Sequence, residues 1–166
     1  MMEILKTKRL VIRELVPGDL DSLYSLYENG GPYIRPLDSN REEERRKLES
    51  YIQYIYGFYG FGLWAVCDKV SGRVIGHCGL QLESIDGVAE LELGYLIDSS
   101  CRRKGYGREC VAAILDYAKE MEGYERIILR IHKDNKESEI FAKSMGFKKS
   151  GLLRQDREYN KYIYEL

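Results

Sequence analysis

The sequence lacks an excess of either charge and lacks any long hydrophobic run. Its 26 basic and 27 acidic residues leave a net charge of −1, which argues against a general affinity for nucleic acid. No apolar run approaches the length of a membrane span, and the opening MMEILKTKRL is charged within a few residues, unlike a signal peptide. We therefore expect a cytoplasmic protein whose partners include neither nucleic acid nor a membrane.

Cysteine and histidine are scarce as well. His77 and His132 are the two histidines, and His77 is at most a weak catalytic candidate because it stands alone within an expected strand. The four cysteines show no C-x-x-C spacing, so we expect buried or incidental thiols in a reducing cytoplasm and no metal site. These cysteines are Cys67, Cys78, Cys101 and Cys110.

Length and composition fit one domain. A chain of 166 residues is enough for one domain and not comfortably two, and a hydrophobic content of 44% supplies a core. The sequence shows no internal repeat, low-complexity tract or linker. We therefore predict a single domain over residues 1–166.

The most informative stretch is 89–121. Apolar residues alternate over 89–97, which predicts a strand, and recur at helical spacing after Gly107. The intervening RRKGYGR (102–108) has two glycines that let the backbone curl, four cations and a helix N-terminus beyond it. This pattern favours a pyrophosphate-binding turn. The alternative is a basic surface turn, and the strand-turn-helix context and the nearby Glu90 and Glu92 count against that alternative.

The remaining periodicity predicts an α/β fold with one sheet of mixed direction. The run 126–132 is apolar on both faces, which is typical of an interior strand. The expected strands are 5–15, 63–69, 73–82, 89–97, 126–132, 148–153 and 158–166, and the expected helices are 19–27, 41–56, 107–122 and 137–145.

The basic turn resembles the acetyl-CoA signature of the GNAT acetyltransferases, (Gln/Arg)-x-x-Gly-x-(Gly/Ala), which reads RRKGYG here. A second landmark of that family is an Asn followed by a short helix that ends in Gly-Phe, matched by Asn135, Ser138 and Gly146-Phe147. The opening TKRLxxR (7–13), the turn GHCG (76–79) and the tail 146–154 resemble the branch that includes the ribosomal-protein N-terminal acetylases. The similarity spans nearly the whole chain in the right order.

The resemblance implies a mixed, mostly antiparallel sheet flanked by helices. Its two central strands, 89–97 and 126–132, would splay apart to hold acetyl-CoA, and the backbone of Tyr95 and Ile97 would pair with the pantetheine arm. The residues that this resemblance assigns to cofactor binding are Tyr95, Ile97, Arg102, Arg103, Lys104, Gly105, Tyr106, Gly107, Arg108, Asn135 and Phe141.

The implied activity is acetyl-CoA-dependent transfer of an acetyl group to a primary amine, by direct attack in a ternary complex. The acceptor would be a protein N-terminus or a small-molecule amine. In similar proteins the first two helices and their connection form one wall of the acceptor site, which places Tyr33 and Arg35 near the substrate. The tyrosines of helix 41–56 would either line that site or pack against a sheet edge. A homodimer is a further expectation from the family.

The free-energy cost of deprotonating the acceptor amine indicates how strong a base the site needs. A lysine side chain, with an ordinary pKa of ~10.4, costs ~4.6 kcal/mol to neutralise at pH 7, whereas an α-amine costs only ~1–1.4 kcal/mol. Glu92 is the first candidate for a weak base and Glu90 the second. They lie two residues apart, so their carboxylates share a face, where mutual repulsion would raise one pKa. The alternative is that they pair with nearby Arg or Lys.

The general acid departs from the pattern of many related proteins. A tyrosine commonly stands seven residues after the Asn, and here Ala142 occupies that position. Ser138 is the available donor near the thiol, where it would hydrogen-bond the sulfur because its hydroxyl is too weak an acid to protonate it. Asn135 would contact the cofactor or cap the following helix.

Three other functions deserve comparison with acetyl transfer. A non-catalytic acyl-CoA-binding or sensing domain on the same fold is compatible with the missing tyrosine. Dinucleotide binding would need a third glycine after Gly105-Tyr106-Gly107, and Cys110 stands there instead. RNA binding through the basic turn lacks a second basic patch.

Overall fold

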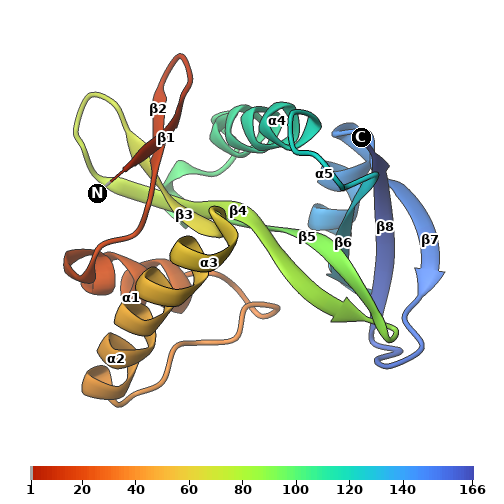
Figure 1. Cartoon of the computed structure of the whole chain (residues 1–166), viewed down its shortest axis with the longest axis horizontal. Helices are drawn as coiled ribbons and strands as arrows, with labels where there is room; N and C mark the ends of the chain where they lie inside the picture. The colour runs from red at the N-terminus through yellow and green to blue at the C-terminus, as the bar shows by residue number, and fades with distance from the viewer. Residues whose placement is uncertain (1) are drawn as a thin grey trace.

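An open, twisted sheet runs through the whole molecule (Figure 1). The computed structural model describes residues 2–166. The described residues form eight strands: β1 (Glu3–Lys6), β2 (Leu10–Arg13), β3 (Leu63–Asp68), β4 (Val74–Ile85), β5 (Val88–Ile97), β6 (Arg126–His132), β7 (Lys148–Leu152) and β8 (Tyr159–Glu165). The α-helices are α1 (Leu20–Glu28), α2 (Arg41–Tyr51), α3 (Gly57–Tyr59), α4 (Tyr106–Lys119) and α5 (Lys136–Ser144).

The strands follow the order β1-β2-β3-β4-β5-β6-β8-β7. Neighbours are antiparallel except β5 and β6, which are parallel and share the single residue pair Glu92–Ile128. By contrast, β4 and β5 pair along their length, from Gly76–Ile97 to Ile85–Val88. The predicted α/β fold, with its mostly antiparallel mixed sheet and two diverging central strands, is confirmed.

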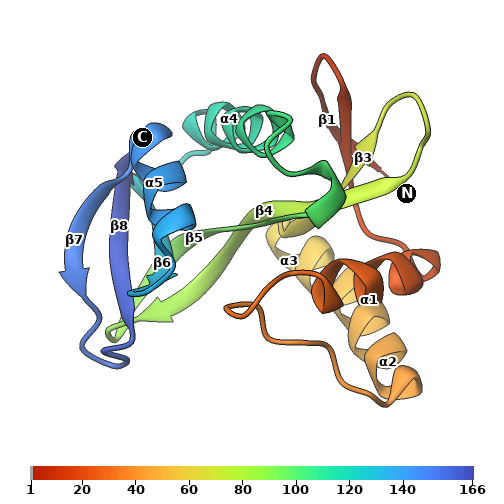
Figure 2. The same ribbon diagram turned by 180° about the vertical axis from the view of Figure 1, so that it is seen from behind.

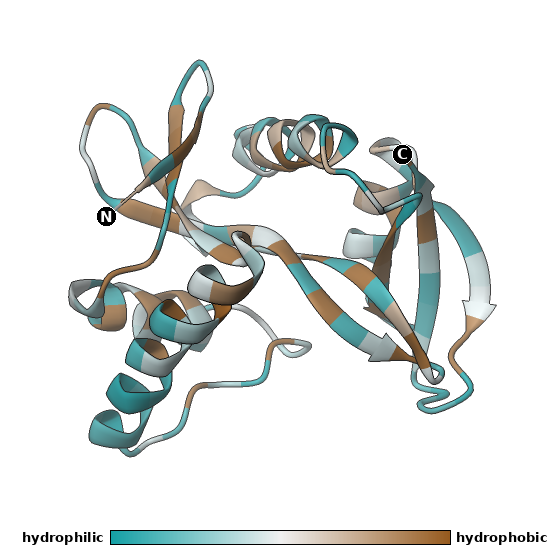
Figure 3. Cartoon of the chain, in the orientation of Figure 1, coloured by the Kyte–Doolittle hydropathy of each residue, from teal (hydrophilic) through white to brown (hydrophobic). Residues whose placement is uncertain are grey.

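Helices cover the two faces of this sheet unequally. Helix α4 lies over one face, whereas α1, α2 and α3 gather below β1 to β4 on the other (Figures 1 and 2). Helix α5 packs against β6 and β7. The charged turns of α2 are hydrophilic, while the strands carry most of the hydrophobic colour (Figure 3).

The buried stripe of α4 explains why this helix forms and where it lies. Its apolar residues recur every three or four positions, so they make one face that packs on the sheet. The buried residues of this stripe are Cys110, Val111, Ile114, Leu115 and Ala118. Trp64 of β3 is fully buried and meets Tyr117 edge-on, with 5.4 Å between ring centroids. All four cysteines are free and buried.

Two elements differ from the sequence-based expectation. The strand predicted over 5–15 is a hairpin, β1 and β2, because Thr7 closes a turn: its backbone N–H donates to the Leu10 carbonyl and its hydroxyl accepts from the Leu10 N–H, both at 3.0 Å. The helix predicted over 41–56 ends at Tyr51 and continues as a π turn over 52–56.

The π turn has a local cause. A π turn places residues five apart on the same side of the helix. This spacing lets the Tyr51 and Tyr56 hydroxyls bond the backbone N–H and carbonyl of Leu63, at 2.7 and 2.5 Å. These two tyrosines therefore anchor the helical segment to β3.

Candidate active site

The turn between β5 and α4 has the backbone of an anion-binding loop. Arg103 and Gly105 both adopt left-handed conformations, with φ of 58° and 82°, and Gly105 is the N-cap of α4. Left-handed residues next to a helix start direct backbone N–H groups toward one side, where the helix N-terminus adds positive potential. A non-glycine residue at positive φ is uncommon, so the surroundings hold Arg103 in place.

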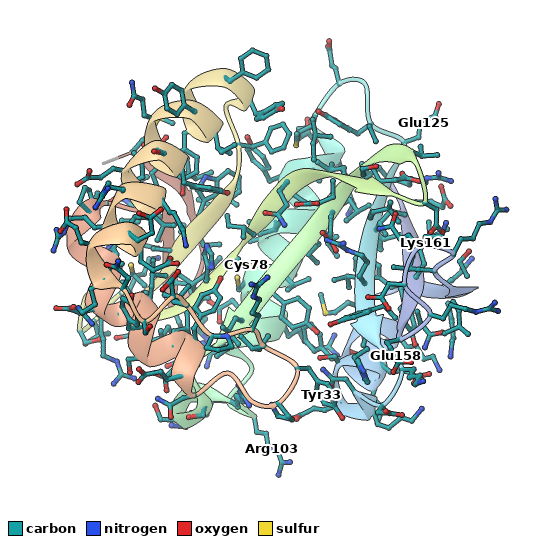
Figure 4. The ribbon with its side chains drawn as sticks, turned by 90° about the horizontal axis from the view of Figure 1, so that it is seen from below. Tyr33, Cys78, Arg103, Glu125, Glu158 and Lys161 are labelled. Atoms are coloured by element: carbon teal, nitrogen blue, oxygen red, sulfur yellow. The ribbon has the colours of Figure 1, made fainter. Side chains whose placement is uncertain are left out.

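A cavity of about 680 Å³ opens beside this turn. Three segments far apart in the sequence form it: the α1–α2 connection at 30–34, the end of β5 with the turn, and the start of α5 at 134–138. Figure 4 shows Tyr33 of the connection beside the strands of the β6–β8 side, and Arg103 extending away from the turn.

Most of the predicted site residues meet at this cavity. Those that line it are Tyr33, Tyr95, Ile97, Arg102, Arg103, Gly105, Gly107, Arg108, Asn135, Ser138 and Phe141. The structure places the other predicted residues outside the lining, and these are Arg35, Glu90, Glu92, Lys104 and Tyr106.

Two arginines brace the walls of the cavity. Arg102 donates from Nε to the Ile97 carbonyl at 3.1 Å and from Nη2 to the Gly30 carbonyl at 2.9 Å, so it ties the turn to the α1–α2 connection. Arg108 donates to the Ser144 hydroxyl at 2.8 Å and so reaches the end of α5. Both arginines line the cavity, and their hydrogen bonds hold its walls in place.

Lys104 and Tyr106 make contacts on the side of the turn away from the cavity. Lys104 Nζ donates to the Ser100 carbonyl at 2.8 Å, and the Arg9 guanidinium lies 4.2 Å from the centre of the Tyr106 ring. Arg9 also donates to the Lys104 carbonyl at 2.9 Å. These contacts support the turn rather than line the cavity.

Glu109 in the first turn of α4 locks the helix to the β1–β2 hairpin. Its carboxylate accepts from the Thr7 hydroxyl at 2.6 Å and from the Arg9 backbone N–H and Nε at 2.7 and 2.6 Å. Burial raises the pKa of Glu109, but these hydrogen bonds outweigh it and lower the pKa overall. The segment 7–9 therefore holds the start of α4, and with it the turn 102–108, against the β1–β2 hairpin.

At the other end of the cavity, β5 faces α5. The Asn135 side chain accepts from the Ser138 N–H at 3.1 Å and so caps α5. The Tyr95 ring packs on Phe141 with centroids 5.0 Å apart. The Tyr95 hydroxyl is buried beside the Ser138 side chain, with which it forms no well-aligned hydrogen bond. Burial raises the pKa of Tyr95 to about 12, with a smaller opposing effect from the Ser138 hydroxyl close by.

Glu90 and Glu92 are held in ion pairs with β6. Arg126 donates to the two oxygens of Glu90 at 2.5 and 3.1 Å, and Arg130 donates to the two oxygens of Glu92 at 2.6 Å each. Both glutamates are buried, with 6% of each residue exposed. This is the alternative weighed from the sequence. The expected repulsion between the carboxylates is offset because each faces its own guanidinium, so this geometry favours a structural role over a base.

The α1–α2 connection brings an aromatic side chain to a residue that the sequence did not single out. Tyr33 stacks on His132 with ring centroids 4.9 Å apart and planes 28° apart, and Tyr159 meets His132 edge-on. His132 ends β6, where it accepts from the Asp134 N–H at 3.2 Å. Arg35 is exposed. The position of His132 at a strand end, on the face of Arg130, was the available signal.

A smaller cavity, of about 210 Å³, lies between α1, α2 and β3–β4. His77 borders it and hydrogen-bonds through Nδ1 with the Tyr27 hydroxyl at 3.0 Å. Burial lowers the pKa of His77 to about 4, so the ring is neutral at pH 7. Tyr51 also lines this cavity. Its hydroxyl also bonds the Leu63 N–H, so the packing interpretation of Tyr51 is confirmed, and its place in an acceptor site stays a prediction.

No helix within residues 2–166 is both long and apolar enough to cross a membrane. Across the same residues, His, Cys, Asp and Glu nowhere gather in a group of three or more that could hold a metal ion.

Comparison with known proteins gives the family. Residues 9–148 match the family described as acetyltransferase (GNAT) domain, which covers most of the chain. The chain therefore belongs to the GNAT acetyltransferases, as its turn and Asn–Gly-Phe landmarks predicted.

Relatives and solved structures agree with this assignment. The uncharacterized N-acetyltransferase YoaA of Bacillus subtilis (strain 168) is 26% identical over 168 residues, which cover 99% of this chain and 90% of YoaA. The crystal structure of an acetyltransferase from Agrobacterium tumefaciens str. C58 has a TM-score of 0.79 at 23% identity, over 100% of this chain and 96% of the other. RimL, a ribosomal L7/L12 alpha-N-protein acetyltransferase in complex with coenzyme A, has a TM-score of 0.76 at 18% identity, over 99% and 98%.

Proposed function

We propose that this protein holds acetyl-CoA as co-substrate in the larger cavity and transfers the acetyl group to a primary amine. The observation that carries the proposal is the position of the turn 102–108 at the mouth of that cavity. Its left-handed Arg103 and Gly105, together with the start of α4, suit the pyrophosphate. Arg102 and Arg108 add full charges on the cavity side.

The glycine at position 107 supports the same assignment. A Cβ built there would meet only ordinary contacts, 3.7 Å to Ile97 and 3.8 Å to Phe141. The backbone therefore approaches the cavity without needing glycine for its own conformation. A substitution at Gly107 fills ligand space rather than straining the fold.

The pantetheine arm would extend along β5 past Ile97 toward Tyr95, Asn135 and Ser138. The thioester supplies an activated acetyl group, and the chain supplies the walls that orient it. Because β6 has diverged from β5 in this region, the edge of β5 is available for such pairing.

The acceptor would approach along the α1–α2 connection, where Tyr33 covers His132. We propose an α-amine, such as a protein N-terminus, as the preferred class. Such an amine costs ~1–1.4 kcal/mol to neutralise at pH 7, and water suffices to take its proton. Glu90 and Glu92 are engaged in ion pairs, so neither carboxylate is free to take that proton. The fold similarity to RimL supports this class.

The test is release of coenzyme A thiol from acetyl-CoA in the presence of matched amines. One short peptide would carry a free α-amine and a blocked lysine, and its counterpart would carry a blocked α-amine and a free lysine. We expect turnover with the first and about 100-fold less with the second, since the difference in neutralisation alone is ~3 kcal/mol.

The main competing function is a non-catalytic acyl-CoA sensor on the same fold. Binding of acetyl-CoA without thiol release from any peptide, polyamine or other small amine would support that function and contradict transfer. A homodimer stays a prediction from the family.

A further inference from the structure

The smaller cavity, between α1, α2 and β3–β4, is separate from the cavity assigned to acetyl-CoA. The two share no lining residue. They lie on either side of a wall in which His77, of the smaller cavity, pairs in register with Leu96, of the larger one. The smaller cavity has a volume of about 210 Å³, and a cavity of ~150 Å³ suffices to hold benzene. It can therefore accept a ligand that carries one small ring.

Leucine side chains form most of this cavity. Six of them line it, and four of the six are buried. The Tyr27 hydroxyl and the His77 ring already hydrogen-bond each other, so a water molecule inside would find few polar partners. An apolar group would be stabilised there, because its entry removes leucine surface from water. The six leucines are Leu15, Leu20, Leu23, Leu37, Leu48 and Leu63.

Glu44 brings a carboxylate oxygen to this apolar space. Its Oε1 accepts from the Asp38 N–H at 3.1 Å and from Lys47 Nζ at 2.9 Å. Its Oε2 makes no hydrogen bond within residues 2–166, and it is not one of the buried polar atoms in that condition, so it is accessible. The Glu44 side chain is 13% exposed and lines the cavity, so its free oxygen is within reach of a ligand held there.

The charges around Glu44 favour a cation over an anion. Among the described residues, Lys47 is the one cation that lines the cavity, and its ammonium is shared between Glu44, at 2.9 Å, and Asp38, at 3.5 Å. Two carboxylates therefore face one ammonium. Burial raises the pKa of the neighbouring Tyr24, and Glu44 and Asp38 raise it further, as expected for an excess of negative charge.

We propose that the smaller cavity binds a small amine with an apolar body. The body lies among the leucines, and the ammonium donates a hydrogen bond to Glu44 Oε2. Hydrogen bonds between charged groups are roughly twice as strong as neutral ones, so an alcohol of the same shape binds less well. A carboxylate of the same shape would meet Glu44 and Asp38 while Lys47 is already engaged. The inference does not rest on the proposed acetyl transfer.

The first test is a calorimetric titration with three probes that share one ring: benzylamine, benzyl alcohol and benzoate. No acetyl-CoA is present, so the result does not depend on transferase activity. We expect benzylamine to bind with a Kd of about 0.1–1 mM, benzyl alcohol roughly tenfold more weakly, and benzoate not measurably. Absence of benzylamine binding, or equal binding of all three probes, would overturn the inference.

The second test locates the ammonium. Glu44→Gln keeps an oxygen for the Asp38 N–H and removes the charge, so we expect it to weaken benzylamine binding about tenfold and to leave benzyl alcohol unchanged. Damage to the fold would instead weaken both probes. Glu43→Gln is the control, because Glu43 is 45% exposed on the same helix and does not line the cavity. Unchanged benzylamine binding in Glu44→Gln would place the amine elsewhere and contradict the inference.

The third test locates the ring. Leu37 is half-buried on the α1–α2 connection and lines the cavity, so Leu37→Trp should fill it. Leu152→Trp is the control, since Leu152 is 46% exposed on β7 and lines neither cavity. We expect benzylamine to raise the unfolding temperature of wild type and Leu152→Trp, and not that of Leu37→Trp. An equal rise in all three proteins would show that the ring binds elsewhere.

The two proposals fail in different ways. If benzylamine binds as expected and no amine supports thiol release, the smaller cavity is a ligand site and the proposed acetyl transfer is wrong. If thiol release occurs and Glu44→Gln binds benzylamine as well as wild type does, the proposed function stands and the second site is wrong.

Discussion

The two halves of β5 differ in what they face. Around Glu90 and Glu92 the strand is joined to β6 by two bidentate ion pairs and one residue pair. Around Tyr95 and Ile97 the same strand borders a cavity whose other wall is α5 and the α1–α2 connection. We call the part around Glu90 and Glu92 the closed half of β5, and the part around Tyr95 and Ile97 the open half.

The difference shows how two neighbouring strands, β5 and β6, can diverge at one end and stay joined at the other. Parallel pairing between β5 and β6 ends at Glu92–Ile128, so backbone hydrogen bonds cannot hold the two sides together beyond it. Arg130 lies beyond that pair and reaches back to Glu92, whereas Arg126 holds Glu90 on the near side of it. We infer that the ion pairs set the width at which the cavity begins.

The largest expected effect concerns His77, whose strand position is paired with Leu96 in the open half. Its pKa of about 4 in the folded protein lies below the ~6.5 of the unfolded chain. Between these values the unfolded state binds the proton and the folded state does not, so stability falls as pH falls. The loss should reach about 3 kcal/mol by pH 4 and vanish above pH 6.5.

The check is urea unfolding from pH 7 to pH 4 in wild type and His77→Gln. The difference between the two free energies of unfolding isolates His77 from the carboxylates that titrate in the same range. Parallel curves would show that His77 does not contribute.

The next prediction concerns the ion pair between Arg130 and Glu92 in the closed half. Arg130→Met leaves the Glu92 carboxylate buried without its partner. We expect a loss of roughly 2–3 kcal/mol, below the range for a fully buried pair because the Arg130 side chain is 30% exposed. Lys161→Met is the control, since Lys161 pairs in register with Arg130 on β8. Its change should stay within about 0.5 kcal/mol in urea unfolding. Equal losses in both variants would contradict the role of the ion pair.

Asn135 sharpens the comparison in the open half. Asn135→Ala removes the cap of α5 and should cost about 1 kcal/mol of stability, measured by thermal unfolding. Asn40→Ala removes the equivalent cap of α2 and should cost about the same. Because only Asn135 lines the larger cavity, only its variant should also weaken acetyl-CoA binding. Equal affinities in the two variants would show that α5 does not shape the site.

The smallest effect concerns catalysis in the closed half. If Glu92 is structural, Glu92→Gln should change kcat/KM less than about threefold, with a pH profile of unchanged shape. Loss of an ionisation from that profile, with a large fall in rate, would restore Glu92 as the base.

The sequence predicted which residues surround the cavity better than it predicted which side chains contact one another. The signature turn and the Asn–Gly-Phe landmarks are local patterns, so the residues around the cavity could be predicted from them. Which partner Glu92 takes depends on the register between β5 and β6, and no local pattern encodes the register of strands joined through a helix. For the same reason the ion pairs appeared only as an alternative.

Tyr95 and the first hairpin show the same limit. Alternation over 89–97 predicted the strand that carries Tyr95, but it cannot show that the ring packs on Phe141 of α5. The hairpin of β1 and β2 was missed because its turn contains Thr7-Lys8-Arg9 and neither glycine nor proline. The bonds from Thr7 and Arg9 to Glu109, about one hundred residues away, explain that segment.

The most direct measurement is a calorimetric titration of acetyl-CoA into wild type, Gly107→Val and Gly57→Val. Gly57 is the control because a Cβ there meets nothing within 4 Å, and it lies outside the cavity lining. We predict micromolar binding by wild type and Gly57→Val, and a loss of at least about 100-fold in Gly107→Val, whose side chain occupies the space proposed for the ligand. Equal binding by all three proteins, or none by wild type, would contradict the assignment of this cavity to acetyl-CoA.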